Sequence, residues 1–335
     1  MRVWEIQQFG IENLALTKRD EPQPKANEVK VKIRAASLNY RDLMMVRGHY
    51  NPKLKMPLVP LSDGAGEVVA VGENVTQWKV GDRVCPTFFQ NWTDGAIEFS
   101  KVKTALGGDL DGVLREYGTF DENGLIGIPA HLSFEEAATL ACAAVTTFNA
   151  LCISGNLQAG ETVLVQGTGG VSIFALQFAK AMDAKVIATS SSDEKLEKVK
   201  SFGADEIINY KQTSDWDKEV LRLTEKRGVD HIVEVGGAGT LGKSLNAVRV
   251  GGHVALIGVL AGNAEVNWTS ILMKAVRLHG IFVGSREMFA AMFKFISEHK
   301  IKPMIDQTFA FDEARESLKH LESGSHFGKI VLKFD

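Results

Sequence analysis

A glycine-rich turn between a short apolar run and a helical pattern constrains the fold of this chain most strongly. Residues 162–165 predict a buried strand, and residues 171–182 predict a helix with one apolar face. Between them stand Gly167-Thr168-Gly169-Gly170-Val171-Ser172. Gly167 permits a tight turn and Gly169 lets the backbone approach a pyrophosphate, while the helix N-terminus offers N–H groups to the anion. This context predicts a dinucleotide site formed by Gly167, Thr168, Gly169, Gly170 and Val171, with Ser172 in place of the fingerprint's third glycine.

Strands and helices alternate after this turn. Strands are predicted at 185–189, 206–208, 230–234, 253–257 and 278–283, and a helix at 194–202. Such alternation indicates βαβ units and a parallel sheet with helices on both faces. The first 125 residues read instead as short strands, as in 28–35, where Val29, Val31 and Ile33 share one face. Near Pro129 the pattern changes, and Ser133 with Glu136 predicts a capped helix start. The prediction is an α/β chain, with a β-rich domain beside a doubly wound domain.

The strand at 185–189 bears on the choice of dinucleotide. An NAD site usually ends this strand with a carboxylate that binds the ribose 2′-hydroxyl. Here the strand ends in Ser190-Ser191-Ser192, and Asp193 is expected to cap the next helix. Lys195 follows within one helical turn and could face a 2′-phosphate, or be an ordinary solvated lysine. The pattern favours NADP over NAD, and Tyr210 could pack on the adenosine end or be a simple strand-end aromatic.

Composition excludes several classes of protein. The 335 residues carry 38 Lys and Arg against 41 Asp and Glu, so a net charge of -3 argues against a chain built to bind nucleic acid or an anionic membrane. No apolar run is long enough for a membrane-spanning helix, and the N-terminus has no signal-peptide pattern. Three distant cysteines form no disulfide framework. We expect a cytoplasmic protein of about two domains.

Several motifs together resemble one known family. They are NYRD at 39–42, GAGEVVAVG at 64–72, GDRV at 81–84, SFEEAATL at 133–140, the glycine turn, and HFGKIVLKF at 326–334. The chain resembles the medium-chain dehydrogenase/reductase superfamily, and within it the zinc-independent quinone oxidoreductase and enoyl reductase branches. The resemblance implies a GroES-like catalytic domain at 1–126 and 285–335, a Rossmann domain at 127–284, and an active site between them.

The resemblance also predicts the absence of a metal. Zinc-dependent members bind the catalytic ion with Cys, His and Cys; the matching positions here hold Asn39, Ser62 and Cys142. Asn and Ser are poor zinc ligands, and one thiolate does not make a site. Residues 90–111 contain no cysteine, so the family's structural-zinc lobe is missing as well.

A zinc-free site needs another group to stabilise charge on the substrate oxygen. The match to the family points to Tyr50, in Gly48-His49-Tyr50-Asn51-Pro52, and to Asn39 as catalytic candidates. The alternatives are an aromatic residue that lines the pocket and an asparagine that stabilises a turn. By the same resemblance, the cofactor contacts are expected from Thr146, Val235, Gly236, Ile257 and Lys329.

The resulting hypothesis is an NADPH-dependent oxidoreductase that transfers hydride to a quinone or an activated C=C bond without zinc. Its partner would be a small apolar carbonyl or quinone substrate. The alternatives are a zinc-free alcohol or aldehyde dehydrogenase-reductase of the same superfamily and a non-catalytic NADPH-binding regulatory protein. The resemblance further implies a homodimer that pairs through an edge strand at 278–283.

Overall fold

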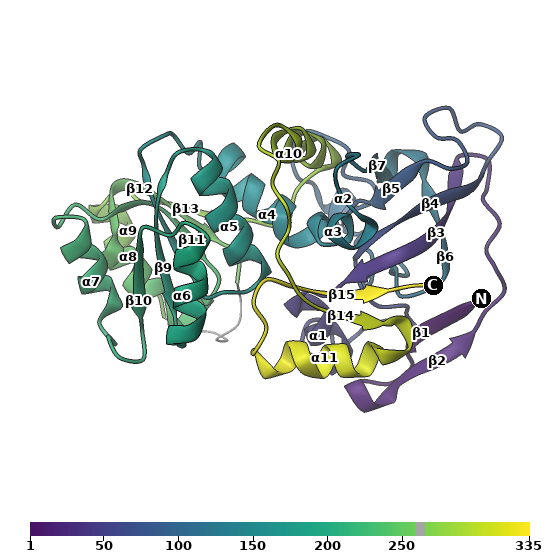
Figure 1. Ribbon diagram of the computed structural model, residues 1–335, viewed down its shortest axis with the longest axis horizontal. Coiled ribbons are helices and arrows are strands. Elements are labelled where there is room, and N and C mark those ends of the chain that lie inside the picture. Colours follow the sequence, from purple (N-terminus) through teal and green to yellow (C-terminus); the bar gives the residue numbers. More distant parts are fainter. Residues whose placement is uncertain (259–264) are drawn as a thin grey trace. The chain divides into compact units, whose positions relative to one another are not determined.

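The computed structural model describes residues 1–258 and 265–335, and the chain forms two compact units (Figure 1). One unit comprises Met1–Val145 with Gly284–Asp335, and the other comprises Thr146–Val283. The units divide between residues 145 and 146, whereas the domain bounds predicted above place the division between 126 and 127. Residues 127–145 therefore belong to the first unit.

The first unit contains a largely antiparallel sheet of seven strands. The order is β14-β15-β3-β4-β5-β7, with β6 paired to β3, and only β14 and β15 run parallel. The strands are β3 (Glu28–Ser37), β4 (Asp63–Val71), β5 (Arg83–Pro86), β6 (Tyr117–Asp121), β7 (Leu125–Gly127), β14 (Ile305–Ala310) and β15 (Lys329–Lys333). A separate hairpin pairs β1 (Arg2–Ile6) with β2 (Leu14–Lys18).

The core of this unit confirms the alternation seen in the sequence. Val29, Val31 and Ile33 of β3 are buried in one apolar cluster. The helices of the unit are α1 (Tyr40–Arg47), α2 (Phe99–Val102), α3 (Phe134–Ala138), α10 (Arg286–Glu298) and α11 (Ala314–Ser323), and α11 runs beside β14 and β15 (Figure 1). The predicted cap is present: Ser133 Oγ accepts from Glu136 N, and the Glu136 carboxylate accepts from Ser133 N.

The predicted helical segment after Ser133 is not one regular helix. After α3 the chain forms a π-helical stretch (Leu140–Ala144), α4 (Val145–Phe148) and a second π-helical stretch (Asn149–Ser154). The chain passes from the first unit to the second inside this segment.

The second unit is the predicted parallel sheet. Its six strands stand in the order β10-β9-β8-β11-β12-β13, and every neighbouring pair is parallel. The strands are β8 (Thr162–Gln166), β9 (Lys185–Ser190), β10 (Glu206–Asn209), β11 (Val229–Glu234), β12 (Val248–Leu256) and β13 (Arg277–Gly280). The helices are α5 (Gly170–Ala181), α6 (Asp193–Ser201), α7 (Trp216–Leu223), α8 (Leu241–Ala247) and α9 (Trp268–Met273).

The direction of the chain reverses between β8 and β11. From β8 it moves outward to β9 and β10, then returns to place β11, β12 and β13 on the other side of β8. In doubly wound sheets, dinucleotides bind at the carboxyl ends of the strands beside this reversal. The predicted glycine turn directly follows β8, at that position.

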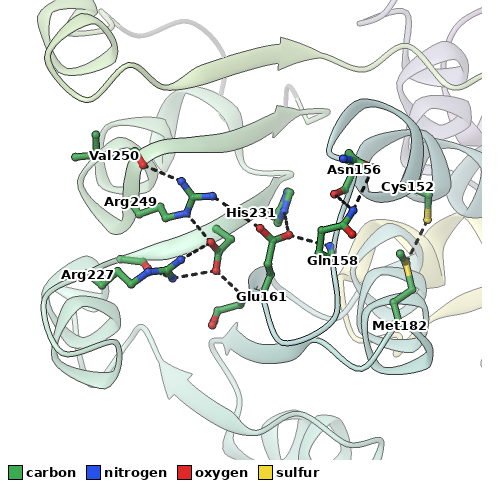
Figure 2. Close-up of polar contacts among 12 residues, drawn as sticks. Cys152, Asn156, Gln158, Glu161, Met182, Arg227, His231, Arg249 and Val250 are labelled. Carbon is green, nitrogen blue, oxygen red and sulfur yellow. Dashed lines mark hydrogen bonds and ion pairs between the residues drawn. The ribbon is translucent and has the colours of Figure 1, made fainter.

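A cluster of ion pairs stabilises the amino-terminal end of the same sheet. Asp230, which is 1% exposed, accepts from Arg227 Nη2 at 2.7 Å, from Arg249 Nε and from Thr162 N. Figure 2 shows Arg227 and Arg249 with Glu161, whose carboxylate lies 2.9 Å from His231 Nε2. The charged side chains at this end of the sheet are thus paired with one another, and this end lies opposite the edge that is predicted to bind the cofactor.

Candidate cofactor and active site

The glycine turn after β8 has the backbone geometry that an anion site requires. Gly167 has φ +72°, and apart from its two chain neighbours no heavy atom of the described residues lies within 4 Å of the position a Cβ would take. Gly169 precedes α5, and no side chain of the described residues caps that helix. Ser172 Oγ donates to Gln166 O at 2.6 Å, which holds the helix against the strand. The first N–H groups of α5 are therefore available to an anion such as a phosphate, next to residues 167–171.

The end of β9 carries the groups expected to select the dinucleotide. Ser190 is buried, and Ser192 Oγ accepts from Lys195 N at 3.3 Å at the start of α6. The one acidic residue of this turn, Asp193, accepts from Asn209 Nδ2 at 2.6 Å and from Gln212 Nε2 at 2.8 Å. The expectation that Asp193 caps α6 is wrong: Ser192 is the cap, and the Asp193 carboxylate, as the first residue of the helix, instead accepts from these two amides. Tyr210 N donates to Ser190 O at 3.0 Å, which places the half-exposed Tyr210 beside the same strand end.

The remaining predicted cofactor residues of the second unit lie at neighbouring strand ends. Val235 and Gly236 follow β11, and Ile257 follows β12; Ile257 N donates to Glu234 O at 2.9 Å. A Cβ on Gly258 would lie 1.5 Å from Val235 O, so only glycine fits there. Thr146 is buried in α4. Residues 167–171, Ser190, Tyr210, Val235, Gly236 and Ile257 thus gather along one edge of the sheet, and this edge fits a dinucleotide.

The first unit brings Asn39 and Lys329 into direct contact. Lys329 is 3% exposed, and its ammonium Nζ donates to Leu38 O and to Asn39 Oδ1, both at 2.6 Å. Lysine has only donors, so it must face the amide oxygen. The amide nitrogen Nδ2 then points elsewhere, and it is buried with no hydrogen-bond partner among the described residues. Such a donor is able to bind the oxygen of a ligand.

Buried charges surround this pair. Asp63 is fully buried, with Oδ2 lying 3.9 Å from Lys329 Nζ and accepting from Cys142 N at 3.1 Å. Asp42, also fully buried, accepts from Asn39 N at 2.8 Å and so fixes the start of α1, and burial raises the pKa of this carboxyl to about 6.

These groups do not suit a zinc ion. Asn39 Oδ1 and Asp63 already face an ammonium, which repels a dication, and Ser62 Oγ donates to Asp63 Oδ1 at 2.7 Å. Cys142 is the one thiol among the three matching positions, and a single thiol does not make a zinc site. Among the described residues, no group of three or more His, Cys, Asp or Glu is arranged to hold a metal.

Tyr50 is connected to this site through Arg41. It lies in the loop after α1 and is 42% exposed, and the Arg41 guanidinium lies over the rings of both Tyr50 and Phe88. Arg41 also donates to Asp42 Oδ1 at 3.3 Å. Burial raises the pKa of the Tyr50 hydroxyl above its ordinary value.

Sequence reasoning missed three residues of these sites. Asp63 follows Ser62, which stands at a zinc-ligand position of the metal-dependent members. A buried acid beside such a position, in a chain without the other ligands, is a signal that another cation lies where the metal would be. Gln166 and Glu234 stand at the ends of apolar strands, where a polar residue on a buried strand is itself a signal. The partner of each lies far away in the chain, so only the fold reveals the contact.

Comparison with known proteins agrees with both units. Residues 25–130 match the family model "Alcohol dehydrogenase GroES-like domain", and residues 170–298 match "Zinc-binding dehydrogenase". The chain is 44% identical to a zinc-type alcohol dehydrogenase-like protein of Schizosaccharomyces pombe, over 97% of this chain and 96% of that protein. It is 29% identical to an acryloyl-coenzyme A reductase of Metallosphaera sedula, over 93% and 94%.

Solved structures show the same architecture. An NAD-dependent alcohol dehydrogenase superposes with a TM-score of 0.90 at 32% identity, over 99% of each chain. A quinone oxidoreductase of Pseudomonas syringae superposes with a TM-score of 0.83 at 27% identity, again over 99% of each. The expected GroES-like and Rossmann parts are confirmed, and the chain belongs to the medium-chain dehydrogenase/reductase superfamily of oxidoreductases.

Proposed function

We propose that this protein is an NADPH-dependent reductase that transfers hydride to a quinone or an activated C=C bond without a catalytic metal. The observation that carries the proposal is the amide of Asn39. Its oxygen is occupied by Lys329, and its buried nitrogen has no acceptor among the described residues. That nitrogen can bind the oxygen of a carbonyl substrate, the task that zinc performs in metal-dependent members.

Different residues of the chain would bind the cofactor, stabilise charge on the substrate oxygen and supply the proton. NADPH, when bound, supplies the hydride. The N-terminus of α5 and the turn at 167–171 would hold its pyrophosphate. Asn39 Nδ2 would donate a hydrogen bond to the carbonyl oxygen of the substrate and so stabilise the negative charge that the reduction puts there. The proton for the product would come from the Tyr50 hydroxyl or from water.

The proposal of NADPH rests on the end of β9. Among the described residues at this strand end, the one acidic side chain next to the serines, Asp193, is engaged by two amides and is not offered to a ribose 2′-hydroxyl. Lys195, in the first turn of α6, supplies positive charge for a 2′-phosphate. Titration followed by tryptophan fluorescence should give tighter binding of NADPH than of NADH. Lys195→Glu should remove that preference, and Lys200→Glu, on an exposed residue of the same helix, should leave it intact. Tighter NADH binding by the wild type contradicts the proposal.

Turnover tests the reaction. NADPH oxidation is measured with quinones, enones, aldehydes and ketones, on protein whose metal content is known. We expect turnover with quinones or enones, and a loss in Tyr50→Phe and Asn39→Ala without loss of NADPH binding. Turnover confined to aldehydes or ketones would favour the alcohol-dehydrogenase alternative, which the name of the 44% identical relative supports. Tight NADPH binding without turnover on any substrate would favour a regulatory NADPH-binding protein.

We further propose a homodimer in a reducing, cytoplasmic setting. The strand β13 is an edge of the parallel sheet and is mostly exposed, so its outer backbone is open to pairing with a second copy. Trp268, Leu272 and Met273 of α9 are each 66% or more exposed. The three cysteines are free thiols. No helix in the described part of the chain is long and apolar enough to cross a membrane.

A further inference from the structure

Glu234 is a fully buried carboxylate that the proposed chemistry leaves without a task. It is the last residue of β11 and 0% exposed. Its Oε1 accepts from Gly236 N and Gly237 N, both at 2.9 Å, and from Thr240 Oγ1. Its Oε2 accepts from Gln166 Nε2 at 2.9 Å and from Ser244 Oγ. Five donors thus converge on one carboxylate, which is strong bonding for a buried charge.

The partner Gln166 completes a link between two strand ends. Gln166 is the last residue of β8, immediately before the glycine turn. Its Nε2 donates to Glu234, and its Oε1 accepts from Val235 N at 3.3 Å. Its main-chain oxygen accepts from Ser172 Oγ in the first turn of α5. The phosphate turn and the loop after β11 are therefore held in register by one pair of side chains.

The main chain of Glu234 adds a third strand end. Glu234 O accepts from Ile257 N at 2.9 Å and from Gly258 N at 3.1 Å, just after β12. The loop at 235–237 and residues 257–258 are in close backbone contact, because a Cβ on Gly258 would lie 1.5 Å from Val235 O. A single residue therefore ties together the loops that follow β8, β11 and β12.

The order of the strands says which half of a dinucleotide these loops face. The glycine turn for the pyrophosphate follows β8, the central strand. The groups proposed for the adenosine half, Ser190, Lys195 and Tyr210, lie on the β9 and β10 side. The other half of an extended dinucleotide must then run toward the ends of β11 and β12. That half carries the nicotinamide.

We infer that Glu234 is a positioning residue that shapes the loops for the nicotinamide half of the cofactor. The inference rests on the proposed dinucleotide binding. Replacement of the carboxylate by an amide would turn an –NH₂ group toward donors, because no orientation of a glutamine offers acceptors to all five. The loop at 235–237 would lose hydrogen bonds to the carboxylate, while the phosphate turn and the end of β9 would keep most of their hydrogen bonds.

The test compares two ligands on one variant. Dissociation constants are measured for the dinucleotide that the wild type prefers and for a fragment, ADP-ribose, which is the same molecule without the nicotinamide ring, with or without the 2′-phosphate to match. In Glu234→Gln we expect binding of the whole dinucleotide to weaken by about tenfold, from the loss of one or two buried hydrogen bonds, with fragment binding unchanged. Glu206→Gln, the same change on an exposed residue of β10, should alter neither constant.

Thr240→Val guards against a variant that fails to fold. It removes one donor on the loop side and leaves the carboxylate in place, so the same selective loss is expected at a smaller size. Hydrogen exchange of Gly236 and Gly237 N–H should rise in both variants.

An equal loss for dinucleotide and fragment would overturn the inference, since a merely structural role weakens both, and so would unchanged dinucleotide binding. A wild type that binds neither dinucleotide would overturn it together with the proposed cofactor. A wild type that binds but turns over no substrate would refute only the proposed reaction.

Discussion

Replacing Lys329 by methionine tests the buried charge pair on which the proposed active site depends. Methionine has similar length and no charge, so Lys329→Met removes the ammonium with little change in volume. Asn39 Oδ1 and Leu38 O lose a donor, and Asp63 loses its nearest cation while it remains fully buried. Arg41 donates to Asp42 rather than to Asp63, so its guanidinium does not take the place of the Lys329 ammonium.

The magnitude follows from distance and burial. At 3.9 Å and an effective dielectric constant of about 20, two unit charges attract by about 4 kcal/mol. Removal of one partner of a buried pair typically costs about 3–5 kcal/mol, because the other charge is left uncompensated. We therefore expect Lys329→Met to lower the stability of the first unit by about 3–5 kcal/mol.

A double-mutant cycle separates the pair from other effects of the substitution. Asp63→Asn removes the negative charge and keeps an oxygen for Ser62 Oγ or Cys142 N. If the two charges interact, the double variant is more stable than the sum of the single losses predicts, by about 2–4 kcal/mol. The chain has two units, so one unfolding transition is not assured. Hydrogen–deuterium exchange of peptides from β3 and β15 reports on the first unit directly.

An additive cycle would refute this reasoning. A coupling below about 0.5 kcal/mol means that the two charges do not stabilise each other and that Lys329 does not stand in for a metal. The same variants also test the orientation of Asn39, because without Lys329 the amide can turn its oxygen toward the substrate. Turnover should then fall in Lys329→Met more than NADPH affinity does.

Three further predictions concern the second unit. Burial, with neighbouring His231, Arg277 and His279, lowers the pKa of His253 to about 4. The unfolded chain therefore binds a proton at this residue before the folded chain does, and the free energy of unfolding falls by about 3 kcal/mol as the pH drops from 6.5 to 4. In urea unfolding, His253→Leu should flatten this dependence on pH, and equal slopes for wild type and variant would contradict the prediction. Asp230→Asn, which breaks the cluster in Figure 2, should destabilise the unit by about 2–4 kcal/mol at neutral pH, and a loss under about 0.5 kcal/mol in the same assay would show that the cluster contributes little. Leu272→Glu should convert the proposed dimer to a monomer in light scattering; a wild type that is already monomeric refutes the dimer, and a variant that stays dimeric refutes this surface.

The fold of the second unit was predictable because its signals are local. The strand, turn and helix at 162–182 occupy consecutive residues, and each glycine has one backbone task. The same holds for the Ser133 cap, where donor and acceptor are three residues apart. The π-helical stretches at 140–144 and 149–154 carry no such local signal, and the chain passes between the two compact units inside this segment.

The contacts that shape the sites join distant parts of the chain. Asn39 and Lys329 are 290 residues apart, and Gln166 and Glu234 are 68 apart. Sequence reasoning named Asn39 and Lys329 separately, by family resemblance, with different tasks. It could not see that the lysine turns the amide, because that depends on the pairing of β15 with β3.

The most direct test of the central claim is NADPH oxidation with a quinone or enone, before and after treatment with a strong chelator, on protein analysed for zinc. The account predicts no stoichiometric zinc and an undiminished rate after chelation. It also predicts that Asn39→Ala loses turnover and keeps NADPH binding. About one zinc per chain, with a rate that chelation abolishes and added zinc restores, would contradict the claim that the Asn39 amide takes the place of the metal.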